Sequence, residues 1–156
     1  MQVSKASQIE ALIGSVRVLI VEDNQYLRKL VRNLLINIGV KQIDEVEEAL
    51  AVLETIRITD PDLVMLEWEL PLLNGAELTR IIRTPGLLVR AGVPIILFSA
   101  TASQARVAEA KRLGVDAYLT MPISAKALAD RIVTILAKPR PSLAEDAAAE
   151  NLVFVV

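Results

Sequence analysis

The sequence predicts an α/β fold in which helices cover both faces of one parallel β-sheet. From residue 17 onward, short aliphatic blocks alternate with longer stretches of helical period, which is typical of parallel strands joined by helices. The blocks are continuously apolar, as expected for strands that are buried on both faces. Right-handed crossovers between such strands favour a doubly wound sheet. Since 53% of the 156 residues are hydrophobic and 3% are aromatic, we expect one domain with an aliphatic core.

The chain divides into a central domain and two extensions. Residues 1–15 form an N-terminal extension, and apolar residues at helical spacing predict a short helix over 4–13. The sheet pattern occupies residues 16–137. Residues 138–156 form a C-terminal tail.

The first strand and helix of the domain have the clearest boundaries. A strand is predicted at 16–21, and apolar residues then recur at three- and four-residue intervals from 27 to 38. Asn24 is suited to cap the start of this helix, and Gly39 to end it in a left-handed conformation.

Four further strands and four helices complete the pattern. The strands, of which the first is the weakest, are predicted at 42–46, 63–66, 94–98 and 117–119. The helices are predicted near 48–57, 75–83 and 101–113, and from Ser124 to the proline at position 139.

Composition excludes several kinds of chemistry. The chain has no histidine and no cysteine, so it cannot contain a Ser-His-Asp or Cys-His nucleophile, a usual zinc site or a disulfide. A net charge of -2 gives no basic surface for nucleic acid or an anionic membrane. No apolar run approaches the ~18 residues of a membrane span, and the N-terminus lacks a signal-peptide core. We therefore expect a cytoplasmic protein that binds neither nucleic acid nor membranes.

The C-terminal tail leaves several interpretations open. It begins with KPRPS, continues through an alanine-rich acidic stretch at 143–151 and ends in LVFVV. An apolar strand at an exposed terminus invites pairing. The tail either packs on its own domain, is disordered, exchanges with a second copy, or docks on a partner.

Acidic and hydroxyl side chains are expected at one edge of the predicted sheet. In an open parallel sheet, ligands bind beyond the carboxyl ends of the strands. The residues that follow the first, third, fourth and fifth strands are Glu22 and Asp23, Glu67, Ser99, and Met121 with Pro122. Because three neighbouring carboxylates repel one another, we expect either a bound cation or a shared proton. Mg²⁺, held by carboxylates, a backbone carbonyl and water, is the simplest cation to propose.

Four segments resemble the receiver domain of two-component response regulators. They are VLIVEDN at 18–24, PDLVMLEWELPLLNG at 61–75, PIILFSA at 94–100 and GVDAYLTMP at 114–122. The resemblance covers about residues 16–137. It implies a flavodoxin-like α/β fold with five parallel strands in the order 2-1-3-4-5 and five helices.

The resemblance also implies a metal and phosphorylation site. In that family an acidic pair and a strand-three carboxylate hold Mg²⁺, and the strand-three residue accepts a phosphoryl group from a kinase histidine. Glu22 and Asp23 match the acidic pair, and Glu67 matches the acceptor. Glu69 matches the residue whose backbone carbonyl joins the metal site. We expect such Mg²⁺ binding to be weak here.

Four other positions match residues that support this site in the family. Ser99 matches the switch hydroxyl and Tyr118 the switch aromatic, which together report phosphorylation to the outer surface. Pro122 matches the proline after a usually cis peptide bond, and Gly75 the glycine that closes the loop beyond the acceptor. Ser99 could alternatively be a packed hydroxyl without a switching role.

Two positions depart from the family pattern. The acceptor aspartate is replaced by Glu67, and the strand-five lysine is replaced by Met121. Glutamate is one methylene longer, and a misplacement of about 1 Å can cost ~100-fold in a positioned reaction. Methionine supplies neither a positive charge nor a hydrogen-bond donor for a phosphoryl group. Both changes argue against ordinary phosphotransfer, and the longer Glu67 could instead imitate the phosphorylated state.

These features predict a stand-alone, atypical receiver that acts as a signalling interaction module and is not an enzyme, beyond residual phosphoryl acceptance. Its expected partners are a histidine kinase or another signalling protein. A homodimer is expected either through the helices at 101–113 and 124–138 with the strand between them, or through the tail. The alternative is a competent receiver that accepts a phosphoryl group from a histidine kinase and hydrolyses it.

Overall fold

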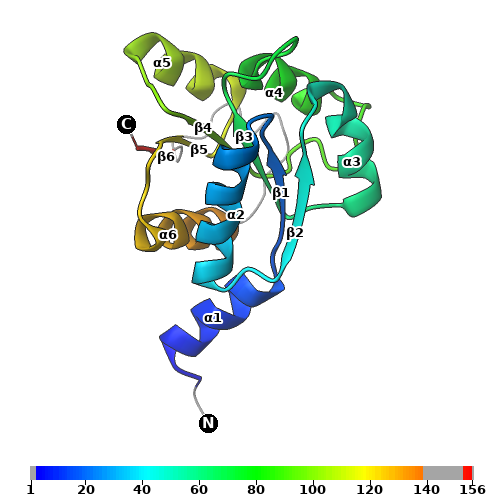
Figure 1. Ribbon diagram of the computed structural model, residues 1–156. Helices are drawn as coiled ribbons and strands as arrows, with labels where there is room; N and C mark the ends of the chain where they lie inside the picture. The colour runs from blue at the N-terminus through cyan, green and yellow to red at the C-terminus, as the bar shows by residue number, and fades with distance from the viewer. Residues whose placement is uncertain (1–2, 139–152, 156) are drawn as a thin grey trace.

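A parallel β-sheet forms the middle layer of the structure (Figure 1). The computed structural model describes residues 3–138 and 153–155. The strands are β1 (Arg17–Val21), β2 (Gln42–Val46), β3 (Leu63–Glu67), β4 (Ile95–Ser99), β5 (Ala117–Thr120) and β6 (Val153–Val155). They lie in the order β2-β1-β3-β4-β5-β6, and every neighbouring pair is parallel. The predicted order 2-1-3-4-5 is therefore confirmed.

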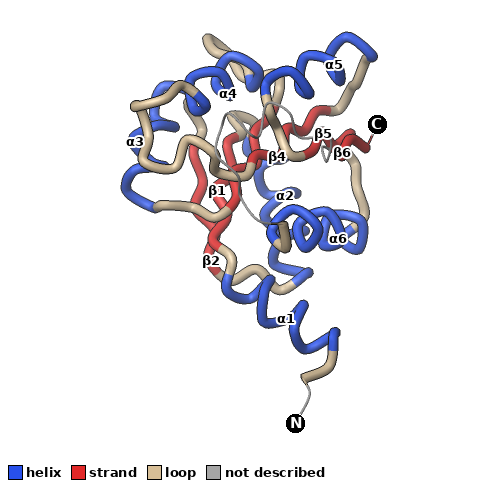
Figure 2. The backbone as a smooth tube through the Cα atoms, turned by 180° about the vertical axis from the view of Figure 1, so that it is seen from behind, coloured by secondary structure: helices blue, strands red, loops and turns tan. Residues whose placement is uncertain are grey.

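Helices cover the two faces of the sheet in two groups (Figure 2). The helices are α1 (Lys5–Ser15), α2 (Gln25–Ile38), α3 (Val52–Thr59), α4 (Gly75–Arg83), α5 (Gln104–Leu113) and α6 (Ala125–Leu136), with a short 3-10 helix η1 (Ala49–Ala51) before α3. One face packs on α2 and α6, with α1 beside α6, and the other face packs on α3, α4 and α5.

Capping side chains set the starts of several helices. Asn24 Oδ1 accepts hydrogen bonds from the first turn of α2, and Gly39 ends this helix with φ 108°, as predicted. Asn74 and Glu77 form a reciprocal capping box at the start of α4. Ser103 caps α5, so this helix begins three residues later than the predicted start at 101.

The core is largely aliphatic, as its composition predicts, and it is split by the sheet into two clusters. Every residue of β3 and β4 is buried, which explains their continuous apolar sequences. Tyr118 and Phe98 are fully buried on opposite faces, Tyr118 toward α4 and α5 and Phe98 toward α2 and α6. Ile13 of α1 is buried in the second cluster, so the N-terminal helix packs on the domain.

Strand β6 extends the sheet beyond the five predicted strands. It pairs in parallel with β5 of the same chain, with Ala117 opposite Val153 and Leu119 opposite Val155. Residues 139–142 of the KPRPS segment and the alanine-rich stretch at 143–151 lie outside the described residues. Pairing with the chain's own sheet is thus the arrangement that the structure has for the apolar end of the tail.

Candidate functional site

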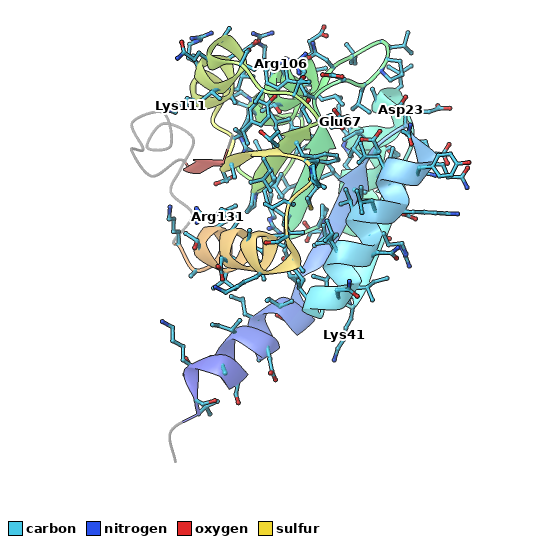
Figure 3. The ribbon with its side chains drawn as sticks, turned by 60° about the vertical axis from the view of Figure 1, so that its left-hand side comes forward. Asp23, Lys41, Glu67, Arg106, Lys111 and Arg131 are labelled. Carbon is cyan, nitrogen blue, oxygen red and sulfur yellow. The ribbon has the colours of Figure 1, made fainter. Side chains whose placement is uncertain are left out.

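The candidate site lies where the carboxyl ends of β1, β3 and β4 meet. Figure 3 shows Asp23, Glu67 and Arg106 at this end of the molecule, with α1 and Lys41 at the opposite end. Glu22 directly follows β1, while Glu67 and Ser99 are the last residues of β3 and β4. The parallel topology therefore brings these predicted residues to one edge of the sheet.

Glu22 and Glu67 form a buried carboxyl pair. Their side chains are only 2% and 4% exposed, respectively. Glu22 Oε1 accepts the Asn24 N–H at 2.9 Å, and Glu67 Oε1 accepts the Glu69 N–H at 3.1 Å. The Oε2 atom of each is buried without a hydrogen-bond donor. Burial, together with the neighbouring Glu67 carboxylate, raises the pKa of Glu22 to about 9, and burial also raises the pKa of Glu67. We therefore expect the pair to hold a proton at neutral pH.

The predicted third carboxylate does not join this pair in a metal-binding group. Asp23 is exposed, although it adjoins Glu22 in sequence. Across the described part of the chain, no three acidic, histidine or cysteine side chains are placed so that they could hold a metal ion. The residues present thus do not fit a ready Mg²⁺ site, and a shared proton meets the charge repulsion instead.

Met121 fills the strand-five position with an apolar side chain. It is 7% exposed and belongs to the aliphatic cluster under α2 and α6. Its backbone N–H donates to the Ser99 carbonyl at 2.8 Å, and the Met121–Pro122 peptide bond is cis, as predicted. In the described structure, neither Glu22 nor Glu67 has a lysine or arginine partner within 4.0 Å. The acceptor position therefore lacks a paired cation.

Ser99 is fully buried, yet its hydroxyl contacts Glu69 and not the acceptor Glu67. Glu69 Oε1 accepts hydrogen bonds from Ser99 Oγ at 3.2 Å, Thr101 Oγ1 at 3.2 Å and the Arg106 guanidinium at 2.8 Å. These contacts, that of Arg106 above all, hold the pKa of Glu69 below its ordinary value. In this structure the carboxylate that reaches the Ser99 hydroxyl is therefore that of Glu69, and whether Glu67 imitates the phosphorylated state stays a prediction.

An aromatic stack supports this cluster from below. The Arg106 guanidinium lies 5.1 Å from the centre of the Trp68 ring, and Trp68 stacks on Tyr118 with ring centres 5.5 Å apart. The Tyr118 hydroxyl donates to the Thr101 carbonyl at 3.0 Å. Tyr118, the predicted switch aromatic, is thus buried and tied to the loop after β4.

Sequence inspection assigned Glu69 only a backbone role and gave Thr101 and Arg106 no role at the site. The only local signal for Arg106 is its position in the first turn after the Ser103 cap, which faces the ends of β3 and β4. Glu69 and Arg106 are 37 positions apart, so a single sequence gives no sign that they pair.

Gly75 is required by close packing at the same edge. A Cβ atom placed there would lie 2.6 Å from the Glu67 carbonyl oxygen and 3.0 Å from Trp68 Cα. The Gly75 N–H donates to the Trp68 carbonyl at 2.8 Å. This contact holds the start of α4 against the segment that carries Glu67, Trp68 and Glu69.

In the described segments, every helix is too short or too polar to cross a lipid bilayer.

Comparisons with known proteins agree with the fold. A family model described as the response regulator receiver domain matches residues 18–133. The chain is 29% identical over 125 residues to the chemotaxis protein CheY-3 of Vibrio cholerae serotype O1, covering 80% of this chain and 95% of that protein.

Solved structures give the same result. A LuxR-family two-component response regulator from Aurantimonas sp. SI85-9A1 superposes with a TM-score of 0.70 at 27% identity, covering 85% of this chain and 95% of the other. Vibrio cholerae CheY4 superposes with a TM-score of 0.69 at 20% identity, covering 78% and 98%. The family model spans most of the sequence, and the order of the first five strands is that of the receiver-domain fold. The chain therefore belongs to the response regulator receiver domain family.

Proposed function

We propose that the chain is an atypical receiver that acts by binding other signalling proteins and does not take up a phosphoryl group in the ordinary way. One observation carries this proposal: the carboxylate at the acceptor position, Glu67, is 4% exposed and paired with Glu22 instead of with a cation. The proposed module is not an enzyme, beyond residual phosphoryl acceptance.

Burial and pairing disfavour Glu67 as a nucleophile. A carboxylate must be ionised and open to an incoming phosphorus atom in order to attack it. Glu67 Oε1 accepts a hydrogen bond from the Glu69 N–H, and Glu67 Oε2 is buried without a hydrogen-bond partner. A phosphoryl group would also bring negative charge to an edge where Met121 provides no neutralising cation.

We expect that Glu22, Asp23 and Glu67 bind Mg²⁺ only weakly. Glu22 and Glu67 are buried and hold a proton that a metal must displace, and Asp23 points from an exposed turn. No step of the proposed function depends on the ion.

The expected partners are those of receiver domains, which interact with histidine kinases and other signalling proteins in the cytoplasm. The face formed by α5 and α6, with β6 covering the outer edge of β5 between them, is our candidate for partner binding and for homodimer formation. It carries the exposed Arg112 and the half-buried Arg131. If this face forms a dimer, then Arg112→Glu or Arg131→Glu should lower the sedimentation coefficient. A sedimentation profile of the unmodified protein that fits a monomer would refute the proposed homodimer.

Intact-mass spectrometry tests the central proposal. The protein is incubated with phosphoramidate and Mg²⁺ and then measured without acid treatment, since acyl phosphates hydrolyse. We expect no stoichiometric gain of a phosphoryl group. A full adduct on the unmodified protein would overturn the proposal and establish the competent receiver instead.

A further inference from the structure

Three hydrogen-bond donors converge on one oxygen at the outer side of the candidate site. Ser99 Oγ, Thr101 Oγ1 and the Arg106 guanidinium all donate to Glu69 Oε1, at 3.2, 3.2 and 2.8 Å. Two hydroxyls and a guanidinium around one negative oxygen are the donor set of an oxyanion-binding site. We propose that these three residues form such a site and that the Glu69 carboxylate is its internal ligand.

The donors are held in place by contacts that do not involve Glu69. The Thr101 N–H donates to Ser99 Oγ at 3.2 Å, and the Tyr118 hydroxyl fixes the Thr101 carbonyl at 3.0 Å. Arg106 lies over Trp68 at 5.1 Å, and its guanidinium also reaches Ser99 Oγ at 3.3 Å. Removal of the Glu69 carboxylate therefore leaves a preformed site that lacks its anion.

The two sides of the contact differ in burial, which makes the internal ligand exchangeable. Ser99 is fully buried, whereas the Glu69 side chain is 51% exposed and the Arg106 side chain 29% exposed. An exposed ion pair is weak on its own. Glu69 competes well only because the short connection from Glu67 keeps it nearby at a high effective concentration. A free oxyanion such as phosphate, or an acidic side chain of a partner, has the chemistry to replace it.

The internal ligand has a structural consequence, which rests on the proposed function. By binding Ser99, Thr101 and Arg106, Glu69 links the segment after β3 to the start of α5 without any phosphoryl group. The Trp68–Tyr118 stack lies beneath this link. The domain is thereby held in one arrangement, and loss of the Glu69 contact releases it.

Inorganic phosphate and the fluorescence of Trp68 test the site, because Trp68 is the only tryptophan and contacts Arg106. The unmodified protein and Glu69→Ala are titrated with phosphate at constant ionic strength, with chloride as the compensating salt. We expect a saturable change in Glu69→Ala, at a half-saturating phosphate concentration at least about tenfold lower than in the unmodified protein. Glu69→Gln, which keeps the shape but not the charge, should lie between them.

Two further variants separate the site from general effects of charge. Glu109→Ala removes a carboxylate that forms a similar ion pair outside the site, with Arg80 at 3.0 Å. This variant should titrate with phosphate like the unmodified protein. Glu69→Ala combined with Arg106→Met should lose the phosphate response. Far-ultraviolet circular dichroism confirms that each variant is folded.

The proposal is overturned if Glu69→Ala shows no phosphate response, or if the unmodified protein responds at the same concentration. A response that survives in the double variant overturns it as well, because Arg106 then supplies no part of the site. These outcomes are independent of the mass measurement. A phosphoryl adduct refutes the proposed function while a phosphate response still supports the site, and a silent Glu69→Ala without an adduct refutes the site alone.

Discussion

Replacing Glu22 with glutamine should change how the stability of the protein depends on pH. The folded protein raises the pKa of Glu22 from 4.5 to about 9, mainly through burial. A carboxyl whose pKa is higher in the folded state favours folding below its unfolded value, and this contribution is lost as pH rises toward the folded value. The free energy of unfolding of the unmodified protein should therefore fall between about pH 5 and pH 9 relative to that of Glu22→Gln.

The size of the effect follows from one retained proton. Each pH unit in this interval lowers the free energy of unfolding of the unmodified protein, relative to that of Glu22→Gln, by about 1.4 kcal/mol. The reason is that the unfolded chain has released a proton that the Glu22–Glu67 pair still holds. From pH 6 to pH 8 the difference between the two proteins should change by about 3 kcal/mol. For a chain of this size that corresponds to a relative shift in Tm of roughly 6–12 °C.

Thermal and urea denaturation, followed by circular dichroism in EDTA, measure this difference. Glu22→Gln should gain stability over the unmodified protein as pH rises, while keeping the oxygen that accepts the Asn24 N–H. Glu48→Gln is the matched control, since this carboxylate is exposed and does not contribute to the raised pKa of Glu22 or Glu67, so its loss should leave the slope unchanged. Parallel pH profiles for Glu22→Gln and the unmodified protein would refute the shared proton.

Three other predictions concern the same edge of the sheet. Gly75→Ala should destabilise the protein by about 1–3 kcal/mol in urea denaturation, because the new Cβ meets the Glu67 carbonyl and the Trp68 backbone; a neutral result would contradict this packing. Glu67→Asp combined with Met121→Lys should gain a phosphoryl adduct in the intact-mass assay. Each single variant should gain less, because the longer side chain at position 67 and the missing cation at position 121 each disfavour phosphoryl transfer. Mg²⁺ should alter Trp68 fluorescence only in the millimolar range, with affinity rising from pH 6 to pH 9 as the competing proton is lost; tight, pH-independent binding would show that the pair does not hold that proton.

Much of the fold could be predicted because local rules and burial agree. Asn24 and Gly39 delimit α2 as capping chemistry requires, and the fully buried β3 and β4 are the blocks with no polar alternation. Strand β6 was harder to predict. A three-residue apolar segment at the end of the tail is compatible with several partners, and only the tertiary arrangement selects β5.

The site was predictable as a set of positions and not as a set of contacts. Strand ends alone bring Glu22, Glu67 and Ser99 to one edge. Which carboxylate reaches Ser99 depends on side-chain direction: Glu67 turns into the sheet edge beside Glu22, whereas Glu69 lies two residues farther along and turns outward to Arg106. Sequence spacing contains no information about that choice.

The two acidic side chains at the end of β3, Glu67 and Glu69, are neutralised in different ways, and this difference explains how the domain tolerates Met121. In the buried layer the negative charge of Glu22 and Glu67 is limited by a shared proton, so the apolar Met121 can pack there without leaving an unpaired ion. In the outer layer the charge of Glu69 is paired with Arg106 of α5. Positive charge at this edge is thus supplied by Arg106 of α5, which binds Glu69 and lies over Trp68. A lysine at position 121 alone would restore charge to the buried layer while Glu69 still occupied Ser99, so recovery of phosphoryl-dependent switching should also require removal of the Glu69 carboxylate.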